Sequence, residues 1–174
     1  AGYIEIGMDH FALPHDDLAI AFVNKTLHRN FMGYTTQNTS FLLGLGMSAI
    51  SDSWFGFAQN DKVVESYIKL LDEDKLPVVK GHILNDLELE IRKYILDLMC
   101  HFETSWEAPA QQFVGLSATL EQLKELEQDH LIEIYPNRLV VKEEGKPFVR
   151  NICMAFDLRM KQRAPETQLF SMTI

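Results

Sequence analysis

The first sixty residues show short apolar runs separated by polar turns, a pattern typical of strands and loops. Residues 3–8 alternate loosely between apolar and polar side chains ahead of Pro14, which predicts a buried strand. Asp16 and Asp17 precede two apolar turns, "LAIAFVNK", as expected where acidic residues open a helix. Residues 28–40 are rich in Asn, Thr, Gly and Ser, and they predict a loop.

An apolar segment follows at residues 41–51, "FLLGLGMSAIS", interrupted by Gly44 and Gly46. Glycine weakens a strand unless another group comes close to its backbone. A ligand lying on the backbone amides would explain the pair, and so would tight packing against a neighbouring strand. An isolated G-x-G is weak evidence for a nucleotide, because no complete G-x-G-x-x-G follows.

From residue 60 onward the apolar spacing becomes helical. "NDKVVESYIKLLDED" places apolar residues on one face of a helix. The strongest helix signal is "NDLELEIRKYILDLMCHF", which begins with Asn85 and Glu88 in the spacing of a capping box. Its apolar stripe consists of Leu87, Ile91, Tyr94, Ile95, Leu98 and Phe102.

The last third of the chain predicts a helix, a hairpin and a helix. "SATLEQLKELEQDH" is helical, "LIEIY-PN-RLVVK" turns at Pro136 and Asn137, and "FVRNICMAFDLRMKQ" forms a long final helix after Pro147. Together with the preceding helix, this order resembles a winged-helix-like module. The predicted fold class is α+β and mostly helical.

Composition and charge narrow the function classes. The 47% hydrophobic and 24% charged content fits a water-soluble globular protein, and no apolar run approaches the roughly 20 residues needed to cross a bilayer. The opening residues have no signal-peptide pattern, so cytoplasm is the expected location and no membrane partner is expected. The 16 basic and 25 acidic residues give a net charge of -9, which argues against nucleic acid as a partner. The helix that would enter a DNA groove is itself acidic.

Few residues offer metal or nucleophilic chemistry. The two cysteines, Cys100 and Cys153, lie in apolar helical patterns, which favours buried reduced thiols over a disulfide or a metal site. Six histidines occur without C-x-x-C or H-E-x-x-H spacing, so no metal site is expected. The serines lack a G-x-S-x-G elbow, and nothing indicates a hydrolase.

Polar groups instead gather in two blocks near the start, "GMDHFALP" and "LHRNFMGYTTQ". A hydrogen bond from His10 to Asp9 would fix the imidazole tautomer. His28 and Arg29 could bind a carboxylate, since a guanidinium offers a planar fork of donors. An arginine that only holds its own loop together fits the sequence equally well.

Five ordered blocks resemble one enzyme family. "GMDHFA", "LHRNF-GYTTQ", "LLGLG-SAIS", "RNICM-FD" and "QLFSMTI" are similar to the C-terminal portion of oxygen-independent coproporphyrinogen III oxidase, a radical S-adenosylmethionine enzyme of haem biosynthesis. The resemblance covers residues 2–174 and is weaker over residues 53–138. It implies that residues 1–58 are the last piece of a partial (β/α) barrel with a substrate and cofactor loop. Residues 59–174 would then form the winged-helix-like C-terminal domain.

The resemblance also implies an activity and cofactors. Such enzymes oxidatively decarboxylate two propionates of coproporphyrinogen III to give protoporphyrinogen IX without oxygen. They use a four-iron four-sulfur cluster, held by C-x-x-x-C-x-x-C, to cleave S-adenosylmethionine. With two distant cysteines this chain has no such motif, so we expect a C-terminal fragment without the cluster and without activity of its own.

The resemblance further implies the site residues. Position by position, Ile50 matches a contact to a second S-adenosylmethionine, whereas Met32 stands where the family has a contacting Gln. That change replaces an amide with a thioether and removes a polar contact. Candidates for lining or bracing the porphyrinogen cavity are Asp9, His10, His28, Arg29 and Tyr34, with Arg29 as the candidate ligand of a substrate propionate.

Two alternatives remain at the level of the sequence. One is a radical S-adenosylmethionine relative that acts in haem trafficking, and the other is a non-catalytic docking domain. Because removing most of a barrel leaves strand edges and apolar faces uncovered, we also expect the fragment to self-associate.

Overall fold

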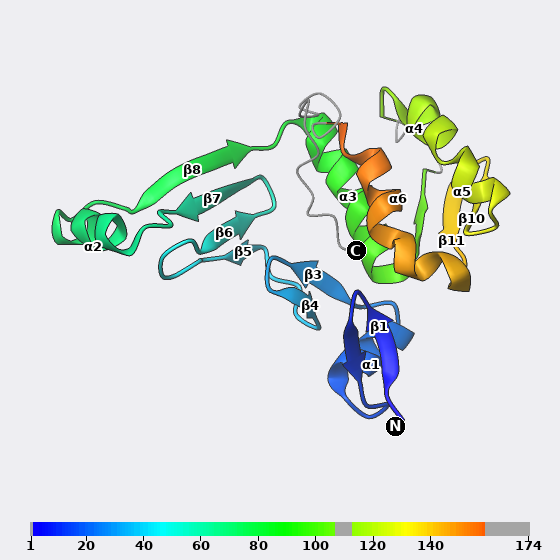
Figure 1. Cartoon of the computed structure of the whole chain (residues 1–174), viewed down its shortest axis with the longest axis horizontal. Coiled ribbons are helices and arrows are strands. Elements are labelled where there is room, and N and C mark those ends of the chain that lie inside the picture. Colours follow the sequence, from blue (N-terminus) through cyan, green and yellow to red (C-terminus); the bar gives the residue numbers. More distant parts are fainter. Residues whose placement is uncertain (1, 107–112, 159–174) are drawn as a thin grey trace, which may run out of the picture. The chain divides into compact units, whose positions relative to one another are not determined.

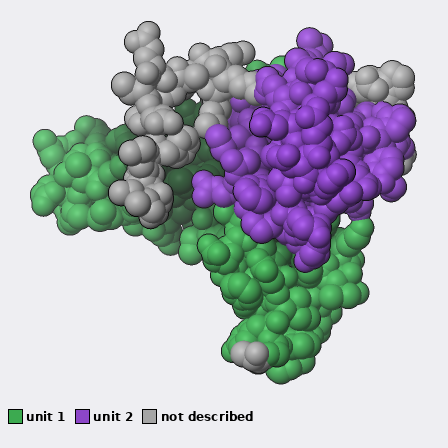
Figure 2. Space-filling view, turned by 45° about the vertical axis from the view of Figure 1, so that its right-hand side comes forward, with its two compact units in different colours: residues 1–101 green, residues 102–174 purple. Residues whose placement is uncertain are grey.

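The computed structural model of the chain describes residues 2–106 and 113–158. The chain divides into two compact units at residues 101 and 102 (Figure 2). The first unit lies within residues 1–101 and the second within residues 102–174. The predicted division between residues 58 and 59 concerns the domains of a longer protein, and it stays a prediction.

The first unit begins with a small hairpin that packs on a helix (Figure 1). Its elements are β1 Ile4–Gly7, β2 His10–Ala12 and α1 Asp17–Val23. The Asp16 side chain caps α1 by accepting a 2.8 Å hydrogen bond from the Leu18 amide. A core of Ile6, Ala12, Ala19, Ala21, Leu27 and Cys100 joins these elements to the end of helix α3, Asp86–His101. The predicted first strand and helix are both present.

A second hairpin, β3 His28–Asn30 and β4 Gly33–Thr35, occupies the segment predicted to be a loop. The prediction was wrong because polar residues hid the pairing, in which Arg29 lies opposite Tyr34 and His28 opposite Thr35. Gly33 closes the turn with a φ of 125°, a conformation that glycine adopts without strain.

A four-stranded antiparallel sheet follows, in the order β5-β6-β7-β8. Its strands are β5 Phe41–Leu42, β6 Ile50–Ser53, β7 Gly56–Asn60 and β8 Val78–Ile83. A Cβ atom on Gly44 would lie 2.7 Å from the backbone of Ile50, so close backbone packing accounts for this glycine. The Asn60 side chain donates to the carbonyl oxygens of Gly44 and Gly46 and fixes the loop between them.

Two helices complete the first unit, α2 Val64–Asp72 and α3 Asp86–His101. The capping box that opens α3 is present: the Glu88 amide donates to Asn85 at 2.9 Å, and the Asn85 amide donates to Glu88 at 3.0 Å. The apolar face predicted for α2 is not buried, because each of Val64, Ile68 and Leu71 is nearly half exposed.

The second unit contains a three-stranded antiparallel sheet in the order β10-β11-β9. Its elements are β9 Glu103–Ser105, α4 Leu116–Gln122, α5 Lys124–Gln128, β10 Ile132–Tyr135, β11 Arg138–Val141, the 3-10 helix η2 Glu143–Phe148 and α6 Val149–Phe156. The predicted hairpin is present with its turn at Pro136 and Asn137.

The helices of this unit differ from the prediction in two places. The single helix predicted over residues 117–130 is two helices that meet at buried Leu123. Pro147 lies inside η2, so α6 begins only at Val149. It ends at Phe156 with Asp157 as its C-cap, earlier than predicted, and residues 159–162 of the predicted helix lie outside the described residues.

The described residues therefore form a mixture of helices and strands, with more strand than the predicted, mostly helical fold. The extra strands are β2, β3, β4, β7, β8 and β9. In the part of the chain that the structure describes, no helix is long and apolar enough to span a bilayer.

Candidate functional site

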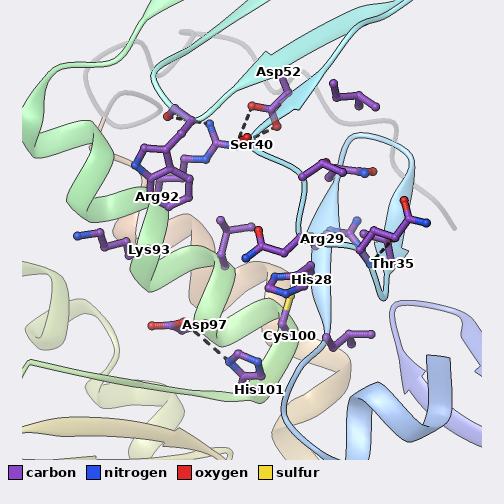
Figure 3. Close-up of a pocket in the computed structure, with 18 residues that line it drawn as sticks. His28, Arg29, Thr35, Ser40, Asp52, Arg92, Lys93, Asp97, Cys100 and His101 are labelled. Atoms are coloured by element: carbon purple, nitrogen blue, oxygen red, sulfur yellow. Dashed lines mark hydrogen bonds and ion pairs between the residues drawn. The ribbon is translucent and has the colours of Figure 1, made fainter. Parts of the chain in front are cut away.

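A cavity of about 470 Å³ lies within the first unit, in the size range of sites for small organic ligands (Figure 3). Its walls come from β3, β4, the segment 37–42, the start of the β6–β7 turn and the last three turns of α3. The residues with ionisable side chains in this lining are His28, Arg29, Asp52, Arg92, Lys93, Asp97, Cys100 and His101.

One wall of the cavity is a buried ion pair between Arg92 and Asp52. The two Asp52 oxygens lie 2.8 and 2.9 Å from Nη2 of Arg92, in a doubly hydrogen-bonded arrangement (Figure 3). Nη1 of Arg92 also donates to the carbonyl oxygens of Ser53 and Trp54. The Asp52 charge is thus compensated inside the cavity, and Arg92 joins α3 to the β6–β7 turn.

Three of the predicted site residues form a stacked cluster beside this cavity. The Arg29 guanidinium lies 4.7 Å from the centre of the Tyr34 ring, and the His10 ring meets the same ring edge-on at 5.1 Å. The Tyr34 hydroxyl donates to the Met99 carbonyl oxygen at 2.9 Å and thereby fixes the ring on α3. Tyr34 therefore holds the guanidinium in one orientation.

Gly33, the first residue of β4, and His10, the first residue of β2, fit closely against each other. A Cβ atom on Gly33 would come within 2.9 Å of Nε2 of His10. Nδ1 of His10 lies 2.9 Å from the Met8 carbonyl oxygen, which favours the tautomer with its proton on Nδ1. The tautomer is thus set by the backbone of the β1–β2 turn, where exposed Asp9 occupies the left-handed region.

Two residues of the cavity lining each carry a buried nitrogen atom that has no hydrogen-bond partner among the described residues. These atoms are Nη1 of Arg29 and Nε2 of His101. Buried donors without partners are uncommon in folded proteins. Burial raises the pKa of the neighbouring Cys100 thiol to about 12, against the opposing influence of the Arg29 charge.

The residues matched to a second S-adenosylmethionine lie apart from this cluster. Ile50 is half-buried at the start of β6, where it pairs with Gln59, and Met32 is 86% exposed at the tip of the β3–β4 hairpin. Neither residue belongs to the lining of the cavity.

The chain does not fit an iron–sulfur cluster. Cys100 and Cys153 are both buried, they are distant in sequence, and they lie in different units. Within residues 2–106 and 113–158, no group of three or more His, Cys, Asp or Glu side chains could hold a metal ion.

Of the residues predicted from the sequence, His28 and Arg29 line the cavity, whereas Asp9, His10 and Tyr34 do not. Asp52, Arg92, Lys93 and His101 also line it and were not predicted. The roles of the predicted residues stay predictions. Asp52 and Arg92 are separated by 40 residues, and neither belongs to a recognisable motif. The one sequence feature that could have indicated any of these residues is the predicted apolar stripe of residues 87–102, because it places Arg92 and Lys93 on a well-defined helix.

Comparison with known proteins found relatives over the whole length of the chain. A protein named oxygen-independent coproporphyrinogen III oxidase from Salmonella typhimurium is 41% identical over 180 residues, covering 100% of this chain and 39% of the relative. The protein of the same name from Synechocystis is 38% identical and covers 99% of this chain and 39% of the relative. A search against family models found no match.

The fold has a solved counterpart as well. The structure of coproporphyrinogen III oxidase from Escherichia coli, described as a radical SAM enzyme, superposes with a TM-score of 0.83 at 37% identity. The superposition covers 91% of this chain and 38% of the other.

The chain combines this mixed fold with a sequence that has no cluster-binding motif. It is homologous to the C-terminal part of a radical SAM enzyme. Over its whole length, the chain is similar to a C-terminal part of proteins named oxygen-independent coproporphyrinogen III oxidase. It spans about 39% of the length of the relatives named above.

Proposed function

We propose that this chain works as the C-terminal part of an enzyme that oxidatively decarboxylates coproporphyrinogen III to protoporphyrinogen IX without oxygen, in haem biosynthesis. The observation that supports this most is the 41% identity over the entire chain to a protein named for that activity. Cytoplasmic location, and the absence of nucleic-acid and membrane partners, belong to the same proposal.

The radical chemistry would be supplied by a four-iron four-sulfur cluster and S-adenosylmethionine bound elsewhere in the enzyme. The two cysteines of this chain cannot hold the cluster. We therefore propose that this part of the enzyme contributes to substrate binding. In the finer architecture, residues 1–58 would end a partial barrel and residues 59–174 would form the winged-helix-like domain. Ile50 would contact a second S-adenosylmethionine. Met32, which stands where the family has a Gln, would not provide the polar contact of that Gln.

Within the substrate site, Arg29 would bind a propionate of the porphyrinogen. Its stacking on Tyr34 supports this role, because the guanidinium is already ordered and its Nη1 is buried without a partner among the described residues. Asp9, His10, His28 and Tyr34 would line or brace the same cavity.

Kinetics of an Arg29→Ala variant of the complete enzyme test this role. Loss of a charge-assisted hydrogen bond costs about 1.5–3 kcal/mol, so we expect KM for coproporphyrinogen III to rise by tenfold or more. Lys80→Ala, which removes an exposed cation outside the cavity lining, should leave KM unchanged. Unaltered kinetics of Arg29→Ala at unaltered stability would remove Arg29 from the site.

The coding sequence upstream of residue 1 separates the proposal from a docking role. A C-x-x-x-C-x-x-C motif there supports a radical enzyme, and the purified full-length protein should then bind a cluster with the brown colour of iron–sulfur proteins. A full-length protein without that motif would instead support a non-catalytic docking module.

A further inference from the structure

Trp54 is the one Phe, Tyr or Trp residue in the described lining of the cavity. It lies in the turn between β6 and β7, directly after Ser53, and it is half-buried. Tight turns between strands usually carry small or polar residues, so the turn itself does not explain a large indole at this position. The indole instead forms part of the cavity wall.

Arg92 holds this indole in one orientation. The guanidinium carbon lies 5.0 Å from the centre of the Trp54 ring, and Nη1 donates to the Trp54 carbonyl oxygen at 3.3 Å. The two hydrogen bonds between Nη2 and the Asp52 carboxylate fix the guanidinium in turn. Because the ring is already ordered, little side-chain entropy is lost when a ligand binds against it.

The indole nitrogen of Trp54 is open to contact with another molecule. Among the described residues, Nε1 has no hydrogen-bond partner, and it does not belong to the buried side-chain atoms that lack one. Nε1 therefore reaches the solvent, where a bound molecule can touch it. Trp106 differs in both respects, because it is only 2% exposed and its Nε1 donates to the Pro136 carbonyl oxygen at 2.9 Å.

The cavity also offers neutral hydrogen-bonding groups. Segment 37–40 of the lining contributes four exposed side chains with amide or hydroxyl groups, Gln37, Asn38, Thr39 and Ser40. An ordered aromatic ring beside amide and hydroxyl groups is typical of a site for a flat, ring-shaped organic molecule that carries polar groups.

We propose that Trp54 is a ligand-binding residue of this cavity, and that its indole packs against a flat heterocyclic ring of the bound molecule.

The inference rests on the proposed function for the identity of that ring, which would be a pyrrole ring of the tetrapyrrole. Trp54 and the residues that order it all belong to this chain. Binding can therefore be measured without the cluster and without turnover.

The test is an absorption titration of the 174-residue chain with coproporphyrin III, a stable tetrapyrrole. We expect Trp54→Leu to weaken binding by about tenfold through loss of the aromatic contact, and Trp54→Phe to stay within about threefold because a smaller ring remains. Phe55→Leu is the matched control and should bind normally, since Phe55 is the next residue of the same turn, is 64% exposed and lies outside the cavity lining. Normal affinity of a folded Trp54→Leu variant, equal losses in Trp54→Leu and Trp54→Phe, or no binding by the unsubstituted chain would each overturn the inference.

Circular dichroism of each variant checks folding. If Trp54→Leu fails to fold, hydroxyl-radical footprinting of the unsubstituted chain in the dark carries the test, with oxidation of each residue measured by mass spectrometry. We expect saturating coproporphyrin III to protect Trp54 from oxidation and to leave the exposed Phe55 unprotected. Equal oxidation of Trp54 with and without the porphyrin would overturn the inference.

Failure of this inference is distinguishable from failure of the proposed function. A full-length enzyme that forms protoporphyrinogen IX, and whose Trp54→Leu variant keeps its KM, would reject the aromatic contact and leave the proposed function intact. A chain that binds the porphyrin through Trp54, in an enzyme that forms no protoporphyrinogen IX, would do the reverse.

Discussion

At the scale of single residues, the cluster around Tyr34 depends on glycine at position 33. A methyl group there would lie 2.9 Å from Nε2 of His10, and the φ of 125° is strained for any residue with a Cβ atom. We expect Gly33→Ala to lower the free energy of unfolding by at least about 1–2 kcal/mol, measured by urea denaturation. Gly2→Ala is the control, since it also has a positive φ but no atom within 4 Å of its added Cβ. Equal stability of the two variants would mean that His10 moves away freely.

The Cys100 thiol gives a second prediction at this scale. Burial raises its pKa to about 12, so the thiol stays protonated well above neutral pH in the folded chain. At pH 8, Cys100 should resist iodoacetamide in the native state and react in denaturant, where its pKa returns to about 8.5. Mass spectrometry of the labelled peptide measures this difference. Rapid labelling of native Cys100 would show that the thiol is accessible.

At the scale of elements, the Arg92–Asp52 pair joins helix α3 to the β6–β7 turn. Replacing Arg92 with Met would leave the Asp52 carboxylate, 10% exposed, without its charged partner. Breaking such a pair from one side typically costs about 3–5 kcal/mol. We expect a loss of this order in the unfolding free energy of Arg92→Met, measured by urea denaturation.

The adjacent Lys93 provides the matched control for that substitution. Lys93→Met removes the same charge from the next position of α3, where the side chain is exposed, and it should change stability by less than about 0.5 kcal/mol. A similar effect of the two substitutions would mean that the ion pair adds no more than a surface charge.

The elements also show where sequence reasoning succeeds. Helix α3 was predicted down to its Asn85–Glu88 capping box, because capping and apolar spacing are encoded within a few residues. The β10–β11 hairpin was predicted for the same reason. The β3–β4 hairpin was missed because its stability comes from cross-strand contacts of Arg29 with Tyr34, which a run of polar residues does not reveal.

The candidate site was predicted only in part, for a related reason. Arg29 and Tyr34 could be found because both lie in one sequence block. The pairing of Arg92 with Asp52 joins residues that are 40 positions apart in the sequence. Long-range pairing of this kind carries no local pattern.

At the scale of the whole chain, exposed apolar side chains predict self-association. Ile68 on α2 is 49% exposed, and Leu76 and Ile83 are each more than 80% exposed. Exposed apolar surface of this extent favours contact with other molecules. Light scattering of the 174-residue chain should report a dimer or larger species whose mass rises with concentration.

Introducing a charge on the apolar face tests the cause of this association. Ile68→Glu should shift the species toward monomer, whereas Val114→Glu adds the same charge at an exposed position of the second unit and should not. A monomer across a wide concentration range in the unsubstituted chain would contradict the prediction.

We propose that the complete protein that contains this chain is a radical enzyme acting on coproporphyrinogen III. The most direct measurement is an anaerobic assay of the full-length protein with reconstituted cluster, reductant and S-adenosylmethionine, with the porphyrins followed by chromatography. We expect loss of coproporphyrinogen III and appearance of protoporphyrinogen IX. Cleavage of S-adenosylmethionine without any porphyrin product would contradict it.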